Sequence, residues 1–146
     1  MDPITISATI SSLIIAVEQI VVVIYEYGSG VKGAEQEINR LCSELFALKA
    51  SLEHVRTNLE NADDQPGSYS AFYSPLIRTD EFRSTLSTTE SLIYDLTRRF
   101  ERALGYVNAA LHSLVWPWRK NDIMEEVQQL ERLKSYFILA TSTDNL

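Results

Sequence analysis

Apolar residues recur along this chain in alternating steps of three and four, in four separate segments. That spacing places one side chain of every turn on the same side of a helix, whereas a half-buried strand needs strict alternation. The pattern predicts four amphipathic helices over residues 3–27, 34–61, 76–114 and 121–141. The predicted core positions are Ile6, Ile10, Leu13, Val17, Ile20 and Ile24; Ile38, Leu41, Leu45, Leu48, Leu52, Val55 and Leu59; Phe82, Leu86, Thr89, Ile93, Leu96, Phe100, Ala103, Val107 and Ala110; and Ile123, Val127, Leu130, Leu133, Phe137 and Ala140.

Each of these segments begins or ends near residues that are common at helix ends. Asp2 followed by Pro3 is typical of a helix start, because the carboxylate caps free N–H groups and proline has none to lose. Pro117 ends the third helix, because the residue before a proline avoids the α region. The polar run 61–74 predicts the longest connection. One extra short helix fits between residues 68 and 78.

The connections indicate how the helices are arranged. The connection between the first and second helices is short, and so is the one between the third and fourth. The two helices of each of these pairs are therefore expected to be antiparallel neighbours. The predicted fold is an all-α, four-helix up-down bundle over residues 1–141. At 146 residues, the chain is long enough for one domain with a substantial core. Residues 142–146 are polar and are predicted to begin a linker to following domains.

The charge and the cysteine content narrow the possible partners. A net charge of -7 argues against nucleic-acid binding and against general attraction to anionic lipid. Cys42 is the only cysteine, which excludes an internal disulfide and is typical of a reducing compartment. It adjoins a predicted apolar stripe and is expected to be buried. No basic segment follows Met1, so no signal peptide is predicted.

No set of residues predicts catalysis. His54 and His112 lie in different predicted helices, and neither belongs to a metalloprotease motif. No Gly-Lys-Ser/Thr follows a glycine-rich stretch, so a phosphate-binding loop is not predicted. We therefore expect no enzyme activity, no cofactor and no metal.

The first predicted helix is unusually apolar. Between Ile10 and Tyr25, only Glu18 and Gln19 are strongly polar. Residues 4–27 as a helix would be about 36 Å long, enough to cross a hydrocarbon core of about 30 Å. A permanent transmembrane helix is not expected, because Glu18 near its middle would cost about 2.5–3.5 kcal/mol on insertion scales. The pattern suits both the core helix of a soluble bundle and a helix that moves from a bundle into a membrane.

Two charged features have alternative interpretations. Glu18 is either an exposed or paired residue at the stripe's edge, or a carboxylate facing a cation-favouring lumen formed by several copies. The basic residues are either a solvated helix surface or contacts for lipid headgroups. These basic residues are Arg98, Arg99, Arg102, Arg119 and Lys120.

Three stretches of the chain carry a resemblance to a known family. They are MDPITISATISSLIIAVEQIVVVIYEY, VKGAEQEINRLCSELFALKASLEHV and LVWPWRKNDIMEEVQQLERLKSYFILAT. They resemble the fungal N-terminal domain of STAND (NOD-like) receptors, a group similar to HeLo-like domains. The most specific part is Trp116-Pro117 followed by Leu130-Glu131-Arg132-Leu133-Lys134. The resemblance covers nearly the whole chain.

The resemblance implies a signalling or cell-death effector domain of a fungal NOD-like receptor. Such domains are associated with programmed cell death, heterokaryon incompatibility and fungal innate immunity. The implied mechanism is oligomerisation of the domain, followed by membrane association or permeabilisation through the first helix. It implies a cytoplasmic domain at rest and a plasma-membrane one when activated. The implied partners are other copies, membrane lipid and downstream domains of the same chain.

Carried onto this chain, the resemblance makes Glu18 the acidic residue of a pore. The residues of the membrane-acting helix would be Ile4, Ile6, Ile10, Leu13, Ile14, Val17, Val21 and Ile24. The alternative is a protein–protein interaction module, an adaptor or dimerisation domain, with no membrane activity.

Overall fold

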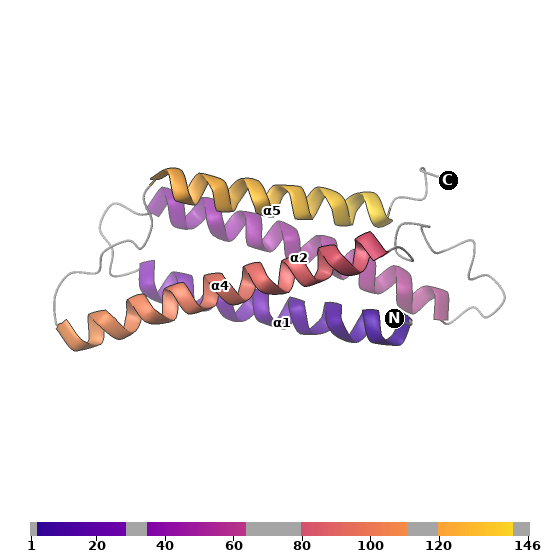
Figure 1. The fold of residues 1–146 in the computed structure, drawn as a ribbon, viewed down its shortest axis with the longest axis horizontal. Coiled ribbons are helices and arrows are strands. Elements are labelled where there is room, and N and C mark those ends of the chain that lie inside the picture. The colour runs from indigo at the N-terminus through magenta and orange to yellow at the C-terminus, as the bar shows by residue number, and fades with distance from the viewer. Residues whose placement is uncertain (1–2, 29–34, 64–79, 111–119, 142–146) are drawn as a thin grey trace.

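The computed structural model describes four segments of the chain, and all four are α-helices (Figure 1). They are α1 (Pro3–Gly28), α2 (Glu35–Asp63), α4 (Asp80–Ala110) and α5 (Lys120–Thr141). The all-α class and the packing of four helices into a bundle are confirmed. The extra short helix between 68 and 78 and the linker at 142–146 fall outside the described residues.

The apolar faces of the four helices form one core. Every predicted core position whose side chain is described is buried. Each fully buried Leu, Ile or Phe contributes roughly 1.5–3 kcal/mol relative to an exposed side chain, so this shared core is the main stabilising term. The positions outside the described side chains are Ala103, Val107, Ala110 and Ile123.

Two polar side chains also lie in the core, and both are hydrogen-bonded. The Thr89 hydroxyl donates to the carbonyl oxygen of Thr85 at 2.8 Å, and the Ser51 hydroxyl donates to that of Leu48 at 2.7 Å. Thr89 occupies a predicted core position in α4. It can do so because its own helix satisfies the hydroxyl group, which removes most of the cost of burying it.

The helices pack in an order that differs from the order of the chain. The most extensive interface joins α2 to α5, followed by α1 with α2 and α1 with α4. In Figure 1, α1 and α2 run antiparallel, whereas α1 runs parallel to α4 and α2 parallel to α5. The expected antiparallel pairing of the first two helices is confirmed. The last two also run antiparallel, but among the described residues they share no comparably packed interface.

Polar contacts hold α2 and α5 side by side. Lys134 Nζ of α5 lies 3.8 Å from Glu44 Oε2 of α2. Further along both helices, the Asn58 side-chain amide donates to the carbonyl oxygen of Thr141 at 3.5 Å. The second contact supplies a partner for one of the carbonyl groups left free at the end of α5.

Helices α4 and α5 meet at one end through aromatic rings. The ring of Phe82 in α4 lies 5.9 Å from that of Phe137 and 6.2 Å from that of Tyr136 in α5. Beyond this contact the two helices diverge toward the C-terminal end of α4 (Figure 1). The bundle is therefore closed on three sides and open along the α4–α5 side.

Candidate functional site

Helix α1 is the first candidate because of its length and composition. Residues Thr5–Glu26 form a 22-residue span with a mean hydropathy of 2.0, and only 39% of its most apolar window is buried in the bundle. Within the described helices, it is the one span long and apolar enough to cross a membrane. Its β-branched run from Ile20 to Ile24 favours strands locally. The run is helical here because Ile20, Val21 and Ile24 pack in the core.

The predicted membrane-acting residues face the core of the bundle. Those with described side chains are all buried: Ile6, Ile10, Leu13, Ile14, Val17, Val21 and Ile24. The side chain of Ile4 lies outside the described set. These residues can reach lipid only if α1 separates from the other helices. Their membrane role stays a prediction.

A different set of α1 residues faces solvent. Ile15, Val22 and Tyr25 are 55%, 56% and 47% exposed. Together with Glu18, these residues are spaced three or four apart, so they lie on the same side of the helix. Sequence reasoning missed these three residues, because it assigned only one apolar stripe to the helix. The available signal was the uninterrupted apolar run from Ile20 to Ile24, which has too many apolar residues for one face.

Glu18 forms an ion pair with the neighbouring helix. Its Oε1 atom lies 3.0 Å from Nζ of Lys49 in α2, and Glu53 Oε1 lies 3.8 Å from the same nitrogen. The side chains of Lys49 and Glu18 are 24% and 51% exposed. The hydrogen bond to Glu18 raises the pKa of Lys49, helped by the charges of Glu18 and Glu53 and opposed by desolvation. In this structure Glu18 is exposed and paired with a basic residue, which is the first of its two interpretations from the sequence, and its pore role stays a prediction.

Cys42 makes a second link between α1 and α2. The thiol is buried, as expected, and burial raises the pKa of Cys42 to about 11, although a hydrogen bond with Tyr25 opposes the shift. A thiol with so high a pKa is protonated at neutral pH and reacts slowly. Tyr25 lies seven residues after Glu18, and Cys42 lies seven before Lys49, as an antiparallel pairing requires. The same register puts Val22 near the level of Phe46, which is also exposed.

The first basic patch can be placed in the structure. Arg98, Arg99 and Arg102 are exposed on α4, and the guanidinium carbon of Arg98 lies 5.6 Å from the centroid of the exposed Tyr94 ring. Lys120 begins α5, but its side chain is not among those described, and Arg119 lies outside the described residues. The arrangement leaves the three arginines accessible from solution. Their contact with headgroups stays a prediction.

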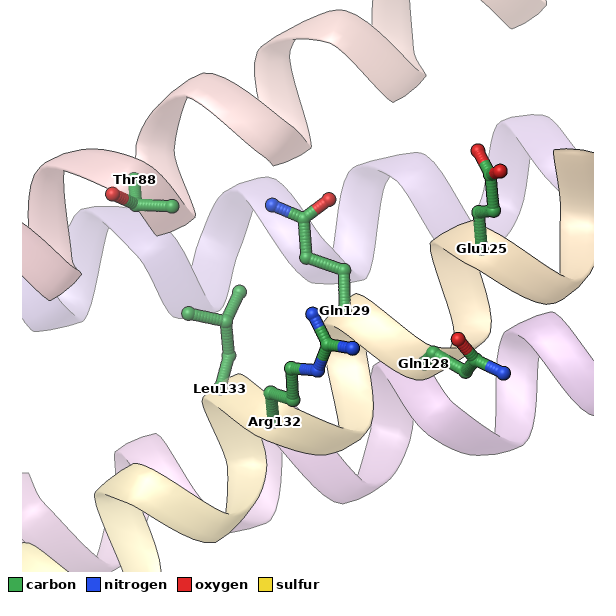
Figure 2. Close-up of a pocket in the computed structure, with 6 residues that line it drawn as sticks. All are labelled: Thr88, Glu125, Gln128, Gln129, Arg132 and Leu133. Carbon is green, nitrogen blue, oxygen red and sulfur yellow. The ribbon is translucent and has the colours of Figure 1, made fainter.

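A groove lies where α4 and α5 diverge (Figure 2). Its volume is about 460 Å³, within the range of small-molecule sites, and most of its lining residues are polar or charged. Sequence reasoning missed the groove because it assumed that these two helices pack together. The lining residues are Thr88 of α4 and Glu125, Gln128, Gln129, Arg132 and Leu133 of α5. These residues line the side of the bundle where α4 and α5, over their described residues, share no extensive interface.

Metal binding was also considered for the part of the chain that the structure describes. Among these residues, no group of three or more His, Cys, Asp or Glu side chains is placed to hold a metal ion.

Comparison with known proteins finds no relative for this chain. No protein-family model, curated protein or solved structure matches this chain.

Proposed function

We propose that this chain is a signalling or cell-death effector domain that acts on membranes through α1 when several copies are clustered. One observation carries the proposal: α1 meets the length and composition of a membrane span, yet less than half of its most apolar window is buried. Eight of the eleven Ile, Leu and Val residues between Thr5 and Glu26 are buried in the bundle, but two others are well exposed. Here Ile15 and Val22 point into solvent, so α1 keeps an apolar surface that lipid would cover.

The free-energy terms for moving α1 into a membrane oppose one another, so insertion is expected only under a specific condition. Between Thr5 and Glu26 lie eleven Ile, Leu and Val residues, which together favour insertion by roughly 3–7 kcal/mol on the biological scale. Glu18 opposes insertion by about 2.5–3.5 kcal/mol, and leaving the core removes the apolar contacts of α1 with α2 and α4. Glu18 alone offsets a large part of the apolar gain, and the lost core contacts oppose insertion further. A single domain therefore gains little by inserting α1, and a trigger is needed.

Clustering supplies such a trigger. The net charge of -7 weakens the attraction of one copy to an anionic surface. Holding several copies together raises their effective concentration at the membrane, without any new contact within one copy. The resemblance to fungal NOD-like receptor domains supports the same scheme, with a cytoplasmic resting state and a plasma-membrane active state.

A second candidate function is a protein–protein interaction module. It is favoured by exposed apolar side chains on helices other than α1. These are Phe46 on α2, Tyr94 on α4, and Ile138 and Leu139 near the end of α5. In that case α1 stays in the bundle, and a partner protein covers one of these surfaces.

Leakage from vesicles tests the proposal. The domain is fused to an inducible oligomeriser and added to liposomes that contain calcium or an anionic dye. We expect release only on clustering, together with a lower ratio of calcium to dye release for Glu18→Gln. Glu53→Gln is the matched control: it removes the other carboxylate beside Lys49 but leaves α1 unchanged, so its calcium-to-dye ratio should equal that of the wild type.

One result would overturn membrane permeabilisation, and another would overturn only the role of Glu18. Vesicles that stay sealed around clustered wild-type protein exclude permeabilisation and favour the interaction module. Equal calcium-to-dye ratios in Glu18→Gln and wild type would remove Glu18 from the pore, while leaving α1 as the inserting helix.

A further inference from the structure

Helix α4 depends on α1 for its place in the bundle. Its extensive interface is with α1, and among the described residues no comparable interface joins it to α2 or α5. Its buried face includes Leu86, Ile93 and Phe100. If α1 leaves, as in the proposed function, this face loses its main cover. The departure of α1 therefore changes the position of α4 as well.

One end of α4 stays attached when α1 is removed. Phe82 contacts the rings of Tyr136 and Phe137, which belong to α5 and not to α1. The opposite end of α4 lies away from α5 (Figure 1). A helix held at one end, and joined to α5 at its other end only through residues 111–119, can rotate about the held end. The aromatic cluster of Phe82, Tyr136 and Phe137 is therefore a pivot.

The groove supplies the space for this rotation. Thr88 lies less than two turns after Phe82 and faces the α5 residues Gln129 and Leu133 across the groove (Figure 2). Leu133 is an apolar wall residue, and it is buried. The polar side chains that α5 contributes to the lining are long, so they can turn their polar ends toward solvent as the helices approach.

We propose that α4 rotates about the aromatic pivot when α1 leaves, closing the groove so that α2, α4 and α5 form a three-helix bundle. This inference rests on the proposed function, in which α1 separates from the bundle. The rotation re-buries the apolar face of α4 against α2 and α5. It thereby lowers the free-energy cost of releasing α1, since the remaining helices keep a shared core.

The test displaces α1 in the full chain without any lipid. Leu13, Val17 and Ile20 are fully or almost fully buried, so Leu13→Asp, Val17→Asp and Ile20→Asp together place three carboxylates where the core cannot hold them. The matched control carries Ser12→Asp, Ile15→Asp and Gln19→Asp. It adds the same charge to exposed positions of the same helix.

Distances between spin labels report the rotation. With Cys42→Ala as background, one label pair at Ser91 and Gln128 spans the α4–α5 side, and a second pair at Ala50 and Ser135 spans α2–α5. All four positions are exposed. In the core variant, we expect the first distance to shorten to that of packed helices, whose axes lie about 8–10 Å apart. The second distance should stay unchanged, and the control variant should match the wild type.

Any other pattern overturns the inference. An unchanged, longer or broadly spread Ser91–Gln128 distance would show that α4 does not close the groove. Loss of helical structure throughout the chain would show that the three remaining helices form no bundle. Because no vesicle is present, either failure leaves the membrane test of α1 standing.

Discussion

Phe82, in the first turn of α4, meets Phe137 of α5 edge to face, with an angle of 84° between the ring planes and 5.9 Å between their centroids. Both side chains are fully buried. This geometry is the favourable arrangement for two aromatic rings. It joins two helices that otherwise diverge, so a large part of the α4–α5 attachment depends on the contacts of Phe82 with Phe137 and Tyr136.

Truncating Phe82 should therefore destabilise the bundle strongly. Phe82→Ala removes a buried ring and leaves a cavity, so we expect the free energy of unfolding to fall by about 3–5 kcal/mol. Urea denaturation followed by circular dichroism measures the change. Tyr94→Ala is the control, because the Tyr94 ring is 60% exposed and its loss should change stability by less than about 0.5 kcal/mol. Similar losses for both variants would show that the aromatic contact does not hold α4.

Cys42 should report the separation of α1. In the resting domain its buried, protonated thiol should react slowly with a thiol reagent at pH 8. Release of α1 uncovers the thiol and removes the contact with Tyr25, so the labelling rate should rise when clustered protein meets vesicles. Unclustered protein under the same conditions is the control. A labelling rate that stays slow while the vesicles leak would show that leakage occurs with α1 still packed on α2.

Stability should fall in alkaline solution. The pKa of Cys42 is about 11 in the folded state against an ordinary 9.0, so the unfolded chain loses its proton first and stability decreases between these values. The pKa of Lys49 is also raised in the folded state. Its contribution to the free energy of unfolding is therefore complete below its ordinary pKa and is lost as the pH rises through its folded-state pKa. Urea midpoints at pH 7, 9 and 10.5 test this. Cys42→Ala should show a smaller decrease, and a wild-type midpoint that rises above pH 9 would contradict the assignment.

Breaking the link between α1 and α2 should make release easier. Lys49→Gln removes the cation that binds Glu18 but leaves the carboxylate in place, so vesicle leakage should begin at a lower degree of clustering than in the wild type. Arg56→Gln is the matched control. It removes one positive charge from α2, but Arg56 pairs with Glu60 of its own helix, with 3.9 Å between Nε and Oε1. Equal thresholds for the two variants would show that charge alone, and not the Glu18 contact, sets the response.

The helices and their buried faces could be predicted from the sequence because both depend on local spacing. Residues such as Leu41, Leu45 and Phe100 occupy positions that follow directly from the helical repeat. The pairing of helices could not be predicted with the same certainty. The packing of α4 on α1 joins residues far apart in the chain, and Thr88 and Gln129 are seen to line a common groove only once the helices are placed.

The candidate site was predicted only in part. The apolar character of α1 and the unusual position of Glu18 were visible in the sequence. The partner of Glu18 was not, because Lys49 lies on another helix and is one of several cations that could have been in range. The exposure of Val22 also depends on where the neighbouring helices stop covering α1. The membrane activity itself stays a prediction.

The pairing of the helices has a consequence for the newly made chain. Helix α2 follows α1 directly and packs against it, whereas its contact with α5 joins Asn58 to Thr141, 83 residues later. Because local contacts form faster than distant ones, we expect α1 and α2 to associate first during synthesis. The most apolar of the four described helices is then covered by the next described helix to be made, before the rest of the chain exists. The order of the helices thus limits the time during which α1 can aggregate with other unfinished chains.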